Sequence, residues 1–175
     1  MSPLARLRPV PLLLVAATGA ALTLVASANG ATAAVDTDVI KVDRSMNGIR
    51  IHNRAWWVVK QMGPPRQVTR GSDDLGRYRI LKYPDRFTVK ISHSIGTVTI
   101  STRSRQPRTT EGIGVGSTLA QLRAEYDVSC QQVPDDPSRQ VCETQPPDLG
   151  ESDTHTVFQL TNQVVRVVKL EICDC

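Results

Sequence analysis

Aromatic side chains are scarce in this sequence: its 175 residues include only two Trp, three Tyr and two Phe. A binding surface built from many aromatic anchors, which dominate the energetics of many protein interfaces, is therefore excluded. The two tryptophans are adjacent, at Trp56 and Trp57, so one short segment holds the strongest anchors that the chain can offer.

Catalytic and metal-binding motifs are also missing. The chain has no G-x-S-x-G nucleophile elbow and no C-x-x-C spacing of the kind that structural zinc sites use. Its three histidines are scattered, at His52, His93 and His155. The glycine-rich residues 112–116 are not a phosphate loop, because no buried strand is predicted before them and no Lys follows. No nucleophile, base and orienting group can be assembled, so we expect a protein that is not an enzyme and that uses no cofactor and no metal.

No cysteine occurs before Cys130, which excludes a lipid-modified cysteine near the N-terminus. The four cysteines, at Cys130, Cys142, Cys173 and Cys175, indicate disulfides if the chain is exported. Four cysteines allow three pairings. We favour Cys130–Cys142, because this bond would close a loop rich in Pro and Asp and would stabilise the fold by roughly 3 kcal/mol. For Cys173 and Cys175, free thiols and bonds to the other two cysteines both remain open.

Residues 1–33 match a cleavable secretory signal. Arg6 and Arg8 form a basic start, residues 10–28 are almost wholly apolar or small, and two A-x-A cleavage sites follow, ending at Ala28 and Ala33. A retained anchor is the alternative, since the apolar stretch is close to the ~20 residues that span a bilayer. We expect cleavage. The protein would then be secreted, into the extracellular space or the cell envelope, with no membrane contact afterwards.

The rest of the chain contains an internal echo. Residues 47–53 and residues 111–117 lie 64 positions apart, and each segment precedes a short helical pattern and a run of strand-like segments. A repeated supersecondary unit can bury its apolar face against its copy. We therefore predict one compact domain with four parts: a disordered N-terminal segment (34–45), repeat unit one (46–102), a linker (103–109) and repeat unit two (110–175).

In unit one, Asn53 is expected to cap a helix over residues 54–62. The apolar residues at helical spacing predict one buried face, made of Ala55, Val58, Val59 and Met62. Gly63-Pro64-Pro65 then ends the helix. A polar loop over residues 67–76 and three strands should follow, over residues 77–83, 86–92 and 97–101.

In unit two, Thr118 and Gln121 predict a capping box at the start of a helix. The apolar stripe of this helix consists of Leu119, Leu122 and Tyr126. Weak strand patterns cover residues 128–132 and 140–143, and strong ones cover residues 157–160 and 164–172. A helix followed by antiparallel strands, twice, predicts an α+β fold: two related units, each a short helix packed on an antiparallel β-meander.

The block of residues 110–119, Tyr126 and the Cys130/Cys142 pair resemble a family of small secreted bacterial proteins. The repeats of this family are similar to those of β-lactamase-inhibitor proteins and of small outer-membrane assembly lipoproteins. The resemblance implies a sheet that carries helices on one face and binds protein partners with the other. No motif here matches an inhibitory hot spot, so no residue role is carried over.

Charge divides at the boundary between the units. Residues 34–110 hold 15 Lys or Arg and 6 Asp, a net charge of +9, whereas residues 111–175 hold 4 Lys or Arg and 11 Asp or Glu, a net charge of −7. We favour the simpler interpretation, in which the two halves attract each other. A basic surface for an acidic partner or a polyanion is the alternative. We expect Glu111, Glu125 and the arginines of the linker to be solvated.

Core packing of both tryptophans is the simpler expectation, because one face of their helix is already apolar. The functional alternative is an exposed tryptophan that anchors a partner, and the candidate partner-binding residues are then Trp56, Trp57, Arg77, Arg79 and Lys82. We expect a secreted protein-interaction module that binds no nucleic acid; an inhibitor of an extracellular hydrolase is one form of it. The alternative is an envelope structural protein that holds an anionic cell-wall polymer through the basic first unit, with Arg66, Arg70, Arg77, Arg79, Lys82 and Arg86.

Overall fold

The structure, a computed structural model, describes residues 39–144 and 154–172. The predicted signal peptide and the pairing of Cys173 and Cys175 lie outside the described residues. The chain divides into two compact units, Met1–Ala33 and Ala34–Cys175, and the second is the one described below. Within its described ranges, no helix is long and apolar enough to cross a membrane.

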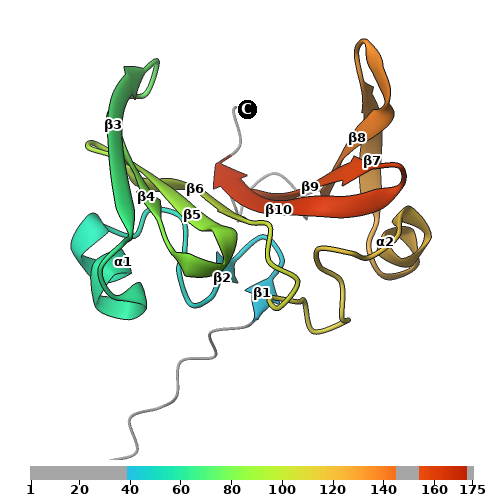
Figure 1. Ribbon diagram of the computed structural model, residues 1–175, viewed down its shortest axis with the longest axis horizontal. Coiled ribbons are helices and arrows are strands. Elements are labelled where there is room, and N and C mark those ends of the chain that lie inside the picture. Colours follow the sequence, from blue (N-terminus) through green and yellow to red (C-terminus); the bar gives the residue numbers. More distant parts are fainter. Residues whose placement is uncertain (1–38, 145–153, 173–175) are drawn as a thin grey trace, which may run out of the picture. The chain divides into compact units, whose positions relative to one another are not determined.

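The second unit is built on one antiparallel sheet of eight strands (Figure 1). The spatial order is β3-β4-β5-β6-β10-β9-β8-β7, so β6 and β10 pair in the middle while β3 and β7 form the edges. The strands are β3 (Gln67–Asp73), β4 (Gly76–Lys82), β5 (Phe87–Ser92), β6 (Gly96–Thr102), β7 (Val128–Val133), β8 (Asp136–Thr144), β9 (Thr154–Thr161) and β10 (Val164–Ile172). Two helices complete an α+β fold, each of them followed in the chain by four of these strands.

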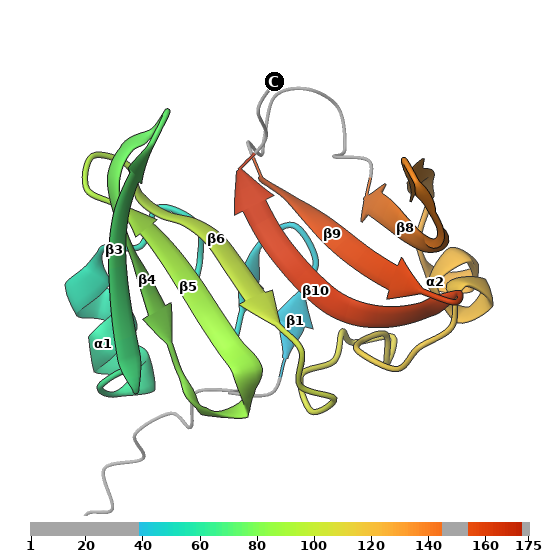
Figure 2. The ribbon, with the colours of Figure 1, turned by 45° about the horizontal axis from the view of Figure 1, so that its top comes forward.

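Both helices, α1 (Ala55–Met62) and α2 (Leu119–Glu125), cover the same face of the sheet (Figure 2). Val58 of α1 and Leu122 of α2 are fully buried in one apolar cluster. The strands contribute every second residue to that cluster, among them Val89, Ile100 and Phe158. Successive side chains of a strand point to opposite faces, so the residues between them lie on the face without helices.

The turns that lead into the two helices share their backbone conformation. Gly48 and Gly112, 64 positions apart, have φ values of 74° and 81°. His52 has φ 66°, and Gly116, again 64 positions further on, has φ 97°. A left-handed conformation at a non-glycine residue costs about 1–2 kcal/mol. His52 therefore keeps the shape of the turn although it lacks the freedom of glycine.

The same backbone hydrogen bonds anchor both turns to the sheet. In each case one N–H of the turn donates to the last strand of the following meander, and that strand donates back to the next residue of the turn. The bonds are His52 N to Thr97 O (2.8 Å) and Thr97 N to Asn53 O (2.9 Å) in the first turn, and Gly116 N to Val165 O (2.9 Å) and Val165 N to Ser117 O (2.8 Å) in the second. Each helix thus starts from a fixed point on its own half of the sheet.

Asn53 closes its turn instead of capping α1, which corrects the prediction. Its Oδ1 accepts a hydrogen bond from Arg50 N (2.8 Å), as Ser117 Oγ accepts one from Gly114 N (3.2 Å). The N-cap of α1 is Arg54, whose side chain makes no capping hydrogen bond. Asn53 and Ser117 therefore each lie one residue before the N-cap, and their side chains close the turn.

The two helices differ in how they begin and in how wide their buried faces are. α2 has the predicted capping box, in which Thr118 Oγ1 accepts from Gln121 N (3.2 Å) and Gln121 Oε1 accepts from Thr118 N (2.9 Å). The buried face of α1 is narrower than predicted, because Val59 is exposed. Val58 alone is fully buried there, with Ala55 and Met62 packed against the core.

Residues 67–76, predicted to be a polar loop, are mostly strand. β3 pairs with β4 along its whole length, from Gln67 opposite Lys82 to Asp73 opposite Gly76. The prediction failed because β3 is an edge strand exposed on both faces, so no apolar alternation marks it. The other predicted strands are present with ends shifted by a few residues, and β10 matches its prediction fully.

Part of the segment 34–45, predicted to be disordered, is ordered. β1 (Ile40–Lys41) pairs with β2 (Ser45–Met46), and Ile40 is buried in the core. Between them, the Asp43 carboxylate accepts hydrogen bonds from Thr144 Oγ1 (2.7 Å) and Thr156 Oγ1 (2.8 Å). These bonds reach strands far along the chain, which is why the polar composition of the segment did not reveal its order.

The linker 103–109 also makes side-chain hydrogen bonds that were not predicted. The Arg108 guanidinium, expected to be solvated, donates to Gly112 O (2.7 Å), Ser117 Oγ (3.2 Å) and Val115 O (3.3 Å). Arg108 thus links three residues of the turn before α2 through hydrogen bonds.

Cys130 and Cys142 form the predicted disulfide. They lie directly opposite each other on β7 and β8, with their Cα atoms 4.0 Å apart. The bond therefore fastens an edge strand, which has a hydrogen-bonded neighbour on only one side, to the rest of the sheet.

Candidate partner-binding cleft

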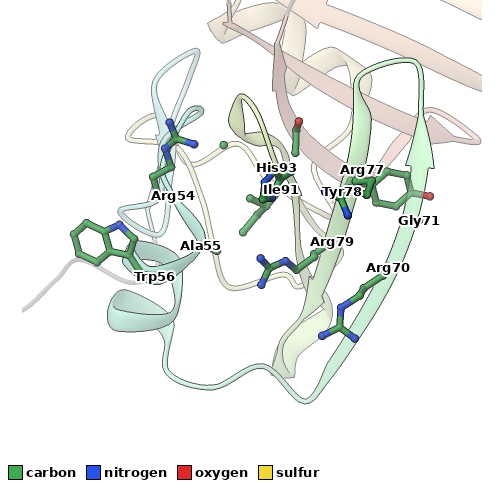
Figure 3. A pocket seen from close by; sticks show the side chains of 12 residues that line it. Arg54, Ala55, Trp56, Arg70, Gly71, Arg77, Tyr78, Arg79, Ile91 and His93 are labelled. Atoms are coloured by element: carbon green, nitrogen blue, oxygen red, sulfur yellow. The ribbon is translucent and has the colours of Figure 1, made fainter.

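A cleft of about 730 Å³ lies between α1 and the end of the β3–β4 hairpin (Figure 3). Figure 3 shows Arg54 and Trp56 on the helix side and Arg79 extending from β4 towards the helix, with His93 and Ile91 between the two walls. We call this site the arginine cleft and define it by Arg54, Trp56, Arg70, Arg77 and Arg79.

Strand alternation brings three of these arginines to one face. Arg79 and Arg77 lie two and four residues before Leu81 on β4, and Leu81 is buried in the core on the helix side of the sheet. Arg70 on β3 pairs directly with Arg79. The arginine cleft therefore lies on the face that carries the helices.

The cleft is electropositive and has no internal counter-charge. No Asp or Glu is among the described residues that line it. Nor do Arg70, Arg77 and Arg79 form an ion pair with any carboxylate in the described part of the chain. Like charges opposite each other on neighbouring strands are destabilising. The Arg70–Arg79 pair is therefore a local conflict of the kind that indicates a binding site.

Arg54 adds a second conflict, at the start of α1. It occupies the N-cap, a position that favours Ser, Thr, Asp or Asn, and its positive charge lies at the positive end of the helix dipole. Its guanidinium reaches across to Ser94 O (3.5 Å), on the turn between β5 and β6. The residue thus gives up helix stability in a position where it contributes to the cleft.

The two tryptophans are not part of the core, which corrects the simpler expectation for both. Trp56 is 66% exposed and lines the cleft. Trp57 is half-buried, and Lys60 Nζ lies 5.5 Å from its ring centroid. The two rings meet edge to face, with their centroids 5.7 Å apart. Trp57 thus supports Trp56 from the side, and only Trp56 belongs to the arginine cleft.

Lys82 does not join the other candidate residues. It is exposed on β4 next to Leu81, so it points to the face without helices. Of the five predicted partner-binding residues, the structure brings Trp56, Arg77 and Arg79 together, and it leaves Trp57 and Lys82 outside.

Charges on the face without helices are largely paired among the described residues. Lys90 Nζ lies 2.5 Å from Asp73 Oδ2 and 4.8 Å from the ring centroid of Tyr78. Lys169 Nζ lies 2.6 Å from Glu171 Oε2, and Glu171 also faces His155. This is the face that the family resemblance assigns to partner binding. These charges on it are paired, whereas Lys82 has no ion pair among the described residues.

Glu111 is hydrogen-bonded to Tyr126, which corrects the expectation that it is only solvated. Burial raises the pKa of Tyr126 to about 12, and its bond to the Glu111 carboxylate acts in the same direction. The same hydrogen bond lowers the pKa of Glu111 from its usual value. The pair joins the turn before α2 to the residue that follows the helix, so its place in the fold is structural.

Groups suited to catalysis or metal binding do not come together in the described part of the chain. No three His, Cys, Asp or Glu residues there are close enough to hold a metal ion. His93 lines the arginine cleft, whereas His155 faces Glu171.

Arg54 and Arg70 were not among the partner-binding residues predicted from sequence, although Arg70 was among the arginines assigned to an anionic wall polymer. Arg70 was placed in a loop, and only the pairing of β3 with β4 sets it beside Arg79. Arg54 carried a usable signal, because an arginine follows the turn at the position where Thr118 follows the second turn. A comparison of the two turns position by position would have singled it out.

Comparisons with known proteins do not assign the chain to a family. No protein-family model matches the chain, and no curated protein sequence matches it. A 1.5 Å crystal structure of an extracellular protein containing an SCP domain from Bacillus anthracis str. Ames is similar, at 9% identity and a TM-score of 0.45. The match covers 71% of this chain and 44% of that one, so the chain spans less than half of the length of that protein. At this level of similarity the match carries no inference.

Proposed function

We propose that this protein is an exported, non-enzymatic module that binds an acidic surface of a protein partner in the arginine cleft. The observation that carries the proposal is that Arg77 and Arg79, which have no carboxylate partner among the described residues, line one cleft with the exposed Trp56. Tryptophan and arginine are the residues in which the binding energy of protein interfaces is most often concentrated.

Export is supported by two independent features. Residues 1–33 have the basic start, apolar middle and small-residue exit of a secretory signal. The Cys130–Cys142 disulfide is of a kind that persists in oxidising compartments and is rare in the cytosol. The resemblance to inhibitor-like repeats favours an extracellular hydrolase as the partner. A β-lactamase is disfavoured, because such inhibitors engage it with many aromatic residues.

The two halves of the sheet, we further infer, are copies of one unit. The support is the 64-position correspondence of the two turns in φ and in hydrogen bonds, and the matching order of one helix and four strands in each half. Arg54 and Thr118, the two N-caps, are also 64 positions apart. Positions where the copies differ, such as these N-caps, are then where a binding function has been added.

The test is capture of partners from culture supernatant and envelope extract on the immobilised mature protein, read by mass spectrometry. A partner should be retained by the wild type, lost by Trp56→Ala and lost by the double variant Arg77→Gln/Arg79→Gln. Lys82→Gln is the matched control, because it removes a positive charge from the same strand on the opposite face. Equal retention by all four proteins would remove the arginine cleft as the binding site.

A second function, the binding of an anionic cell-wall polymer, is favoured by one observation: Arg70 and Arg79 stand opposite each other without a counter-charge. Contacts of this kind are screened by salt, whereas a contact anchored by Trp56 persists. The screening length falls to roughly half between about 50 mM and about 300 mM salt. Retention on a wall preparation that collapses over this range, and that is unchanged in Trp56→Ala, would select the polymer. Retention that does not respond to salt would reject it.

A further inference from the structure

A second cleft, of about 660 Å³, lies where the residues before β5 and the residues after β6 approach the start of β10. Five arginines from four segments of the chain line it: Arg86, Arg103, Arg105, Arg139 and Arg166. All five are exposed. We call it the junction cleft, because its lining comes from both halves of the sheet.

The charge of the junction cleft does not follow from the composition of the half that supplies β8 and β10. Residues 111–175 hold 4 Lys or Arg against 11 Asp or Glu, yet two of those four cations, Arg139 and Arg166, lie here. Asp85 is the one carboxylate among the lining residues that the structure describes. Arg139 lies 3.9 Å from Asp136, a long and exposed contact. The remaining arginines have no described ion pair, so the cleft keeps a net positive charge of about three, counting whole charges at neutral pH.

The backbone around the junction cleft is irregular at the residues that supply the charge. Arg166 is the extra residue of a β-bulge, because Val165 and Val167 pair with the adjacent residues Leu160 and Gln159. A bulge re-aims the side chain that it carries and is frequent beside functional sites. Arg86 also has a positive φ, of 59°. Such a conformation at a non-glycine residue costs about 1–3 kcal/mol and needs a compensating reason.

Apolar side chains form part of the lining beneath the arginines. Val167, Leu160 and Val115 all line the cleft and are almost fully buried. Charges near a low-dielectric floor interact more strongly with an anion than charges surrounded by water. A volume of about 660 Å³ is also within the range of small-ligand sites.

We propose that the junction cleft binds a ligand with two or more phosphoryl groups. Arginine matches phosphate oxygens with two parallel hydrogen bonds. A chain of linked phosphates places several charges within the span of the cleft. Side-chain carboxylates on one face of an extended peptide are farther apart, about 6–7 Å, because they occupy every second residue. The high charge density of the cleft therefore fits linked phosphates better than an acidic peptide.

The first arm of the test titrates the full mature protein with tripolyphosphate at 50 mM salt by calorimetry. The wild type should bind, and Arg139→Gln/Arg166→Gln should weaken binding at least tenfold. The double variant Arg50→Gln/Arg123→Gln is the matched control, because it removes the same charge from exposed positions outside both clefts and should bind like the wild type. Near-ultraviolet circular dichroism of each variant shows that the fold is intact. Failure of wild-type binding, or equal weakening by both double variants, would overturn the site.

The second arm distinguishes the sources of the ligand and the competing ligand class. A phosphodiester polymer and tripolyphosphate are compared with citrate and poly-glutamate under the same conditions. Preference for the polymer identifies an envelope polymer as the source, and preference for tripolyphosphate identifies a free oligophosphate; both support phosphoryl recognition. Tighter binding of citrate or poly-glutamate than of either phosphoryl probe would overturn it. None of these outcomes depends on Trp56, so the proposed partner binding in the arginine cleft is tested separately.

Discussion

The two halves of the sheet share a backbone plan but differ in what stabilises it. In the second half, Thr118 caps α2 and the Cys130–Cys142 disulfide fastens the edge strand β7. In the first half, Arg54 stands at the N-cap of α1 without a capping bond, and the edge strand β3 has no cross-link. The half that carries the arginine cleft is therefore the half with fewer local stabilising features.

The proposed partner binding would account for this difference. Arg54 and the Arg70–Arg79 pair break local rules, and both contribute to one cleft. Proteins commonly break such rules at functional sites, whereas positions without a function stay consistent with the fold. The second half obeys the rules at its N-cap, so it serves as an internal reference for the first.

Of the variants considered, Gly96→Ala, in the first half, should lower the free energy of unfolding the most. A Cβ at Gly96 would lie 2.5 Å from the backbone oxygen of His52, in the turn that anchors α1, and φ is 97° there. We expect a loss of about 4 kcal/mol in the free energy of unfolding, from overpacking against backbone and from left-handed strain. Urea unfolding followed by circular dichroism measures it.

The control for Gly96→Ala is Gly116→Ala, in the turn of the second half. Its φ is also 97°, but the nearest atom to its Cβ would be Arg105 Nε at 3.7 Å. Only the left-handed strain applies, so a loss of about 1–2 kcal/mol is expected. Equal losses in the two variants would show that the close approach to His52 is not what constrains Gly96.

Removal of the disulfide should have the next largest effect and should act on the second half. Cys130→Ser/Cys142→Ser is expected to lower the free energy of unfolding by about 3 kcal/mol, since the bond closes a short loop. Hydrogen exchange should rise most in β7 and β8 and should stay unchanged in β3, the other edge strand. A uniform rise across the sheet would mean that the edge strands are not stabilised independently.

Alkaline pH should also weaken the second half, by a smaller amount. The unfolded pKa of a tyrosine is 10.0, and the folded pKa of Tyr126 is raised to about 12, mainly by burial. The folded state therefore holds this proton more tightly, and the contribution is complete below pH 10 and lost as pH rises from 10 to 12. Burial raises the pKa of Tyr83 as well, so the wild type must be compared with Tyr126→Phe.

In Tyr126→Phe, part of the fall in stability between pH 10 and pH 12 should be absent, and the tyrosine titration read at 295 nm should lose its most alkaline step. The control is a measurement at pH 7, where the contribution of Tyr126 does not vary with pH. An identical alkaline profile in both proteins would show that Tyr126 is not protected in the folded state.

The N-cap residue can be removed from the helix of the second half and supplied to the helix of the first. Thr118→Ala removes the capping box of α2 and should cost about 1 kcal/mol. Arg54→Thr supplies the matching residue to α1 and removes a cation from the helix N-terminus, so a gain of about 1 kcal/mol is expected. Thermal unfolding measures both. Arg54→Thr should also weaken partner binding; a variant that is stabilised and binds normally would place Arg54 outside the binding site.

The fold was more predictable from sequence than the cleft, for reasons visible in particular residues. The capping box at Thr118, the disulfide and β10 rest on local spacing, and local spacing is what a sequence displays. β3 and the order of residues 40–45 rest on partners elsewhere in the chain, such as the bonds from Thr144 and Thr156 to Asp43. The arginine cleft depends on the same kind of long-range pairing.

The smallest effect on stability should come from placing at Met62, in the first half, the residue type found at Tyr126 in the second half. Met62 stands 64 positions before Tyr126, and Asn47 stands 64 positions before Glu111, the partner of Tyr126. Met62 and Asn47 line one cavity of about 230 Å³, in which the buried Asn47 Oδ1 has no hydrogen-bond partner among the described residues. Met62→Tyr would place a hydroxyl donor where the other half has one.

Met62→Phe is the matched variant, because it adds the same ring without the hydroxyl. Satisfying a buried acceptor contributes about 1 kcal/mol, so Met62→Tyr should be more stable than Met62→Phe by that amount in urea unfolding. The comparison cancels any crowding of the cavity, which both rings share. Equal stability would mean that Asn47 does not occupy the role of Glu111, and the correspondence between the halves would then end at the turns and not extend to the side chains beneath them.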